Sequence, residues 1–88
     1  LEARADYPEA CNNLGSLLHE EGRHAEAERA LRRAIALAPD YVEALGNLAA
    51  LHVERGEEVE ALRCLGQALE RDPDHRPVLL QLARLQLK

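Results

Sequence analysis

The feature that most constrains this chain of 88 residues is an internal repeat with a period of 34 residues. The stretch DYPEACNNLG at residues 6–15 is echoed by DYVEALGNLA at residues 40–49. When residues 6–39 are laid over residues 40–73, 15 of the 34 positions are identical, and a shorter third copy begins at Asp74. A period of this length is typical of arrays in which one helical unit stacks on the next.

Each full unit carries the signals of two helices. Asp6 and Glu9 have the spacing of a capping box, and Asp40 and Glu43 repeat it one period later. Apolar residues then recur at intervals of three and four, which predicts one buried face on each helix. The composition agrees, because Leu, Ala, Glu and Arg are strong helix formers. The sequence therefore predicts an all-α protein.

Glycine and proline mark the predicted ends of these helices. Gly22 and Gly56 lie where the first helix of each unit should end in a left-handed residue. Pro39 and Pro73 lie where the second helix should stop. The second helices are predicted to begin near His24 and Glu58.

Small residues recur where neighbouring helices should approach most closely, and leucines recur where they should fill the space between. The small residues are Gly15, Ala49 and Ala83, with Ala27 and Ala61 and with Ala34 and Ala68. The leucines are Leu14, Leu48 and Leu82, with Leu31 and Leu65. We expect all of them to act in packing.

Charge and motif content exclude several classes of function. The formal net charge of −5 disfavours the phosphate backbone of nucleic acids, and no apolar run is long enough to span a membrane. No metal-binding, nucleotide-binding or nucleophile motif is present, so neither a cofactor nor a catalytic residue is expected. Cys11 and Cys64 are interpreted as small buried residues, with a disulfide or reactive thiol as the alternative.

The spaced residues of the three copies resemble the tetratricopeptide repeat, whose pattern is W-x2-L-G-x2-Y, then A-x3-F, then Pro. The first copy reads Cys11-x2-Leu14-Gly15-x2-Leu18, Ala27-x3-Leu31, Pro39. The second reads Leu45-x2-Leu48-Ala49-x2-His52, Ala61-x3-Leu65, Pro73, and the third reads Leu79-x2-Leu82-Ala83-x2-Gln86. The large aromatic residues of the pattern are replaced throughout by Cys, Leu, His or Gln. His52 is therefore expected to pack in an aromatic position.

The resemblance implies a right-handed α-α superhelix, that is, a tetratricopeptide repeat solenoid of two full helix-turn-helix repeats plus a C-terminal helix. The predicted organisation is an N-terminal flank at 1–5, repeats at 6–39 and 40–73, and the first helix of a third repeat or a capping helix at 74–88. The start at Leu1 and the nearly all-round apolar last helix suggest a piece of a longer array. A cytoplasmic location is the expectation for this segment.

In such a superhelix the first helices line a concave groove, which in this family typically binds peptides or proteins. By register, the candidate groove residues are Glu9, Asn12, Asn13, Ser16, His19, Glu43, Asn47, Ala50, Leu80, Gln81 and Arg84. Asn13, Asn47 and Gln81 form a row of one amide per unit, and an amide can bond both the C=O and the N–H of an extended peptide. This row is similar to the asparagine row in the superhelix of protein O-linked N-acetylglucosamine transferases. The alternative is that these amides bond neighbouring helices or water.

The resulting prediction is a non-catalytic protein–protein interaction scaffold. Four glutamates of the groove favour a basic or neutral ligand over an acidic one: Glu9, Glu20, Glu43 and Glu54. Two alternatives remain: a substrate-recruiting superhelix segment of a larger enzyme such as a glycosyltransferase, and a structural or oligomerisation spacer. Self-association through the C-terminal helix is expected, because its exposed face is apolar.

Overall fold

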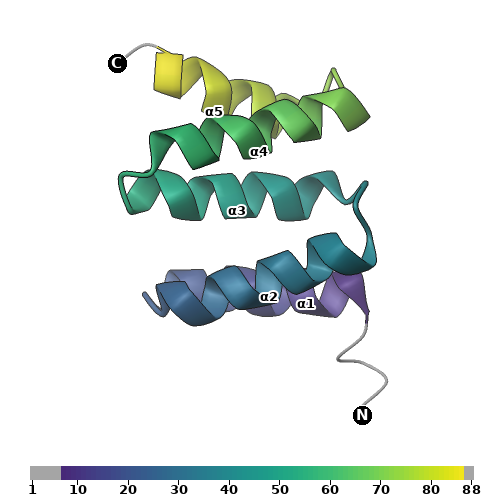
Figure 1. The fold of residues 1–88 in the computed structure, drawn as a ribbon, viewed down its shortest axis with the longest axis vertical. Coiled ribbons are helices and arrows are strands. Elements are labelled where there is room, and N and C mark those ends of the chain that lie inside the picture. The colour runs from purple at the N-terminus through teal and green to yellow at the C-terminus, as the bar shows by residue number, and fades with distance from the viewer. Residues whose placement is uncertain (1–6, 87–88) are drawn as a thin grey trace.

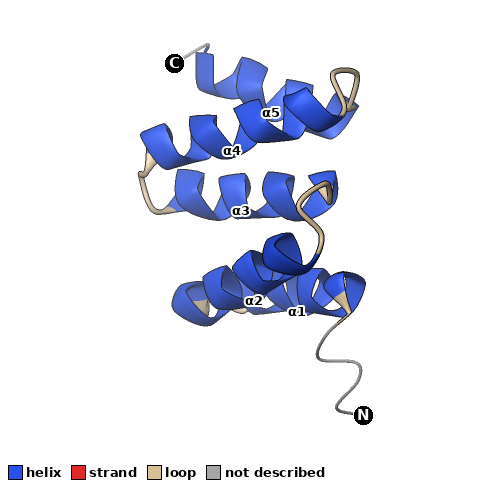
Figure 2. Ribbon diagram, turned by 45° about the vertical axis from the view of Figure 1, so that its right-hand side comes forward, coloured by secondary structure: helices blue, strands red, loops and turns tan. Residues whose placement is uncertain are grey.

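The computed structural model describes residues 7–86, which form five α-helices and no strand. The helices are α1 (Pro8–Glu20), α2 (His24–Leu37), α3 (Val42–Glu54), α4 (Glu58–Arg71) and α5 (Arg76–Gln86). Short loops join them into an elongated stack that measures 43 × 27 × 17 Å (Figures 1 and 2). The predicted all-α helical-repeat fold is confirmed.

Helices of one unit pair closely, and the pairs then stack. α1 packs against α2 and α3 packs against α4, while α2–α3 and α4–α5 contacts join successive pairs (Figure 1). The first helices also touch one another in order, α1 with α3 and α3 with α5. This continuous row of first helices builds the face on which the candidate groove residues lie.

The turn inside each pair uses a glycine in the left-handed region. Gly22 has φ of 79° and Gly56 has φ of 75°. In each turn the next residue donates its N–H to the helix end: Arg23 to Leu18 O at 2.9 Å, and Glu57 to His52 O at 2.8 Å. This is the hydrogen bond of a Schellman motif, which satisfies carbonyl groups that a helix end leaves open. The predicted helix ends and the second-helix starts are confirmed.

The predicted capping box is wrong by one residue at Asp40. The residue at the N-cap of α3 is Tyr41, with extended φ and ψ of −77° and 91°, and no side chain caps the helix. Tyr7 has the same place before α1, again with no side-chain cap, and Asp6 lies outside the described residues. Asp40 thus lies one residue before the N-cap, and its carboxylate is 3.9 Å from Arg71 Nη1.

The core is centred on α3, which lies between α2 and α4. Eight residues of α3 are buried, against three of α1. The largest fully buried side chains are Leu31, Leu45, Leu51, Leu65 and Val78. Cys11 and Cys64 are buried thiols and no disulfide joins them, as the packing interpretation predicted.

The packing prediction is wrong for Leu14. Its side chain is 50% exposed, whereas Leu48, at the same position of the next unit, is 2% exposed. Leu48 packs on the second helix of the preceding unit, and no described helix precedes α1. Ala83 is likewise exposed on α5, because no described second helix covers that face.

Candidate functional site

Two neighbouring depressions lie along the row of first helices. The first, of about 250 Å³, is lined by Asn12, Glu43, Gly46, Asn47, His75, Pro77, Val78 and Gln81. The second, of about 480 Å³, is lined by Ala50, Val53, Glu54, Gln81, Arg84 and Leu85. Gln81 borders both, so the two form one continuous surface between α3 and α5. We call this surface the groove.

Amides of the predicted row form hydrogen bonds between the first helices of successive units. We call the α1–α3 contact the first seam and the α3–α5 contact the second seam. Asn47 Nδ2 donates to Asn12 Oδ1 at 2.9 Å, and Gln81 Nε2 donates to the Gly46 carbonyl at 3.3 Å. Each bond joins a residue to a partner 35 positions earlier. Asn47 and Gln81 are equivalent positions of successive units, and so are their partners Asn12 and Gly46. The same contact is therefore made at both places where units meet. An amide has two N–H groups and an oxygen, so one donated bond leaves it further bonding capacity.

Both seams are joined by a hydrogen bond from a side-chain amide, but the residues that form it differ. In the first seam a short asparagine meets an asparagine side chain; in the second, the longer glutamine reaches a backbone carbonyl. Gly46 has no side chain that could accept this bond, and a Cβ built there would be at ordinary contact distance, 3.4 Å from Gln81 Nε2 and 3.6 Å from Val78 Cγ2. The extra methylene of Gln81 thus compensates for the missing side chain of Gly46.

Asn12 is the buried centre of the first seam. It is 7% exposed and is hydrogen-bonded to both Asn47 and Tyr41. Burial raises the pKa of the half-buried Tyr41 hydroxyl, and the bond to Asn12 partly offsets this rise. A buried polar group is normally hydrogen-bonded, and the bond from Asn47 meets this requirement at Asn12.

The two groove carboxylates, Glu43 and Glu54, each lie near histidines, of which His75 lines the groove and His19 and His24 do not. Glu54 Oε1 lies 3.1 Å from His19 Nε2 and 3.8 Å from His24 Nε2, and the two rings meet edge to face at 5.9 Å. The His19 contact is a close approach without hydrogen-bond geometry. Glu43 lies 4.0 Å from His75. The Glu43 and Glu54 side chains are 62% and 55% exposed, so both carboxylates remain open to solvent.

The structure brings together part of the predicted set. The groove contains Asn12, Glu43, Asn47, Ala50, Gln81 and Arg84. Four predicted residues of α1 lie outside the lining of the two depressions: Glu9, Asn13, Ser16 and His19. Leu80 lines another hollow along α5, which shares Pro77 with the first depression. Asn13 is exposed, so the amide row of the described residues has two bridging members, Asn47 and Gln81, rather than three.

The helical register also places Gly46, Val53, Glu54 and Pro77 on this side. The lining residues that sequence reasoning missed are therefore His75, Val78 and Leu85. His75 precedes α5 in a loop, where the helical register that selected the other candidates does not apply. Val78 and Leu85 belong to the last helix, whose sequence is apolar almost all round and therefore does not indicate which of its residues line a groove. Apolar residues of α5 such as Val78 and Leu85 can pack on the core and line the groove at the same time.

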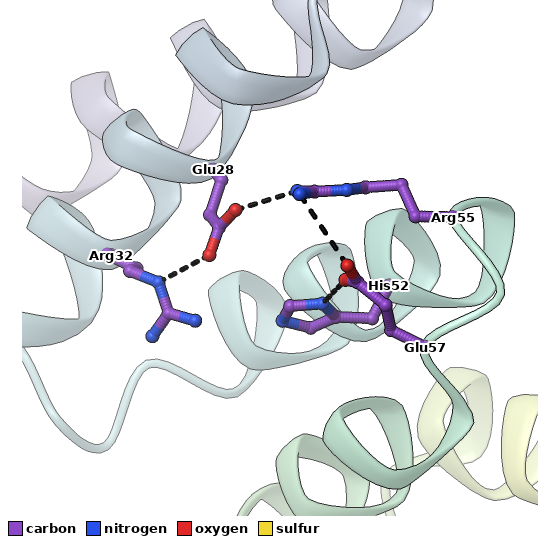
Figure 3. A network of polar contacts seen from close by, with 5 residues as sticks. All are labelled: Glu28, Arg32, His52, Arg55 and Glu57. Carbon is purple, nitrogen blue, oxygen red and sulfur yellow. Dashed lines mark hydrogen bonds and ion pairs between the residues drawn. The ribbon is translucent and has the colours of Figure 1, made fainter.

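A second polar cluster joins the first unit to the turn of the second (Figure 3). Arg55 Nη1 donates to Glu28 Oε1 at 2.7 Å, and Arg32 Nε donates to Glu28 Oε2 at 2.8 Å. His52 Nδ1 lies 2.6 Å from Glu57 Oε1, and Arg55 is also within 3.6 Å of Glu57. His52 is only 3% exposed. Its predicted packing role is confirmed, and the hydrogen bond to Glu57 satisfies the polar ring in a buried position.

This cluster holds Glu28 in its charged form. The hydrogen bonds from Arg55 first, and from Arg32 second, lower the pKa of the Glu28 carboxyl. A carboxyl whose pKa is lower in the folded state stabilises the fold above its unfolded pKa. That stabilisation is lost as the pH falls through the folded value. The contact of Glu28 with Arg55 thus links α2 to the end of α3 in a pH-dependent way.

We expect Glu28→Gln to lower the free energy of unfolding at neutral pH by about 1 kcal/mol or less, because the ion pairs are partly exposed. The difference from the unchanged chain should disappear in acid below the lowered pKa of Glu28. Urea unfolding at both pH values measures this. Glu26→Gln, in an exposed pair with Arg23 within one helix and turn, is the matched control and should have little effect. An equal loss at neutral and acid pH would show that the charge of Glu28 is not responsible.

The remaining depression near the core lies between the second helices. It measures about 300 Å³ and is lined by Arg32, Ile35, Ala36, Leu45, Leu48, His52, Glu60, Arg63, Cys64 and Gln67. Burial raises the pKa of the Cys64 thiol, which disfavours the reactive thiolate. No group of three or more metal-ligating side chains within residues 7–86 could hold a metal ion. Within the same range, no helix has the length and apolarity needed to cross a bilayer.

Comparison with known proteins agrees with the repeat geometry. A family model described as tetratricopeptide repeat matches residues 18–75, which is more than half of the chain. A comparison with curated proteins finds no match. Repeats of this kind commonly mediate protein–protein interaction. The helices are paired, the glycine turns lie at the same place in both units, and the family model matches residues 18–75, so the chain belongs to the tetratricopeptide repeat family.

Proposed function

We propose that this chain is a non-catalytic scaffold that binds an extended basic or neutral peptide segment along the groove. The observation that carries the proposal is the continuous surface around Gln81, where two exposed carboxylates flank bridging amides. An extended segment presents its backbone C=O and N–H groups along its length, and amides can bond both. The groove of repeat scaffolds is thereby suited to segments without fixed structure.

The two depressions support different side-chain preferences. Glu43 and His75 border the first, so a Lys or Arg of the ligand would be attracted to the Glu43 carboxylate. The second has apolar walls from Ala50, Val53 and Leu85, which favour an apolar side chain. We infer a ligand in which a basic residue is followed or preceded by an apolar one, within the reach of a few extended residues.

A charge-reversal experiment tests this proposal. An array of short peptides in basic, neutral and acidic sets is the probe, and the strongest binders are measured by fluorescence anisotropy. Glu43→Lys with Glu54→Lys should weaken binding of basic peptides by at least tenfold, roughly 1.4 kcal/mol. Glu60→Lys with Glu70→Lys changes the net charge equally on α4 and should leave binding unchanged. Equal losses in both pairs, or no loss in the groove pair, would contradict the proposal.

The amide row supports a second candidate, a substrate-recruiting segment of a larger enzyme similar to the glycosyltransferases named above. Amides that bond only the ligand backbone bind peptides with little regard to their side chains. If this candidate is correct, basic, neutral and acidic peptides should bind with similar affinity. Asn47→Ala should weaken the binding, and Glu43→Lys with Glu54→Lys should leave it unchanged. Circular dichroism of Asn47→Ala is the necessary control, because its bond to Asn12 also joins two units.

A further inference from the structure

The two end helices each expose an apolar face whose counterpart in the middle of the array is buried. On α1, Leu14 and Leu17 are 50% and 52% exposed, whereas their repeat partners Leu48 and Leu51 are 2% and 0% exposed. We call the surface of Leu14, Leu17 and the following acidic pair Glu20 and Glu21 the α1 face. Identical residues at these positions pack against a neighbouring helix wherever one is present, so the α1 face has the chemistry of a helix interface.

α5 also exposes a leucine whose equivalent in α3 is buried. Leu79 is 41% exposed, and Leu45 at its position in α3 is 2% exposed. Leu80 is 56% exposed beside it. Together with Arg76, Pro77 and Ala83 these residues frame a hollow of about 630 Å³, which we call the α5 face. A hollow of this kind can receive apolar side chains from another helix.

The charges of the two faces are opposite. The α5 face contains Arg76 and no acidic residue, whereas Arg84 of the same helix lines the groove. α1 contains Glu9 and Glu20 and no Lys or Arg, and Glu21 follows it directly. Pairing α5 with α5 would leave Arg76 without a carboxylate on the partner helix, and pairing α1 with α1 would leave Glu20 and Glu21 without a basic partner on it. Pairing α5 with α1 would bring opposite charges together.

We propose that the chain associates head to tail, with the α5 face of one copy docked on the α1 face of the next. In an antiparallel arrangement, which is how successive helices of this array pack, Arg76 at the start of α5 lies beside Glu20 and Glu21 at the end of α1. The leucines of the two faces then cover one another. Such a contact is heterologous, so each copy keeps an unused face at either end and association continues beyond the dimer.

The contact places α1 of the next copy antiparallel against α5, in the position that a second helix has relative to a first helix elsewhere in the array. It is one helix wide, and small interfaces are weak. Assembly is therefore expected to rise steeply with concentration and to fall with salt, since part of the attraction is between exposed charges. The proposal does not depend on peptide binding in the groove, and Glu43→Lys with Glu54→Lys should leave assembly unchanged.

Sedimentation velocity over a concentration series tests the proposal. The unchanged chain should show an average mass that passes beyond the dimer as concentration rises. Arg76→Glu, and separately Glu20→Lys with Glu21→Lys, should each remain monomeric over the same range. An equimolar mixture of these two variants should assemble again, because each acidic α5 face then meets a basic α1 face. Recovery on mixing also shows that both variants are folded.

Matched controls and contrary outcomes complete the test. Leu80→Glu, which places a charge on the α5 face, should also remain monomeric. Its control is Leu62→Glu at an exposed leucine of α4, and Arg63→Glu on α4 repeats the charge change of Arg76→Glu. Both controls should assemble normally. A monomer at every concentration would overturn the proposal. So would a dimer that the α5 changes abolish and the α1 changes do not, since that indicates α5 pairing with α5. Failure of the mixed variants to assemble would overturn it as well.

Discussion

Leu51→Ala is expected to lower the free energy of unfolding by about 2–5 kcal/mol, the range for deleting a buried leucine side chain. Leu51 is 0% exposed. It lies in α3, which contacts each of the other four helices of the described chain. The loss combines the hydrophobic contribution of the removed atoms with the cavity they leave. For a domain of this size that is a large part of the total stability. Urea unfolding followed by circular dichroism measures it.

Leu17→Ala is the matched control for Leu51→Ala. The two leucines have the same position in successive units, but Leu17 is 52% exposed. Its removal should cost less than about 1 kcal/mol when measured at low concentration, because little area leaves the protein interior. Similar losses from the two substitutions would mean that Leu17 is as well covered as Leu51, and would contradict the arrangement of helices described here.

Gly15→Ala is expected to destabilise the chain by about 1–3 kcal/mol, although alanine is the better helix former. A Cβ at position 15 would lie 2.6 Å from Leu31 Cγ, 2.7 Å from Leu31 Cδ2 and 3.3 Å from the Ala27 carbonyl oxygen. Leu31 is fully buried and cannot move aside without disturbing the α1–α2 contact. The steric cost therefore exceeds the gain in helix propensity.

Gly66→Ala should change the free energy of unfolding in the opposite direction and stabilise the chain. Gly66 lies within α4, and a Cβ built there meets no atom within 4 Å. The substitution should raise the free energy of unfolding by up to about 1 kcal/mol through helix propensity alone. Thermal unfolding of the two variants side by side separates the effects. A stabilised Gly15→Ala would show that the α1–α2 contact is looser than the geometry indicates.

Much of the helical architecture could be predicted because its signals are local. The apolar periodicity, the glycines at 22 and 56 and the prolines at 39 and 73 act within a turn or two of the backbone. They predicted the paired helices correctly. The error at Asp40 is also local, since a one-residue shift in where a helix begins does not change the periodicity that revealed it.

The groove was only partly predictable, because its polar contacts join residues that are far apart in the chain. Register placed Asn47 and Gln81 on one face but did not reveal that each reaches back across a seam to Asn12 or Gly46. The same holds for Arg55 and Glu28, which are 27 residues apart. Whether such side chains meet depends on the angle at which units stack, and the repeat period does not specify that angle.

By itself the sequence determined the helices, their turns and their assignment to repeated units, because those depend on backbone preferences and spacing within each unit. Only the tertiary structure decided which of two identical residues is buried, as the pairs Leu14 and Leu48 or Leu17 and Leu51 show. The physical reason is that burial belongs to the neighbourhood of a residue and not to the residue. A leucine leaves water only where another helix is present to cover it.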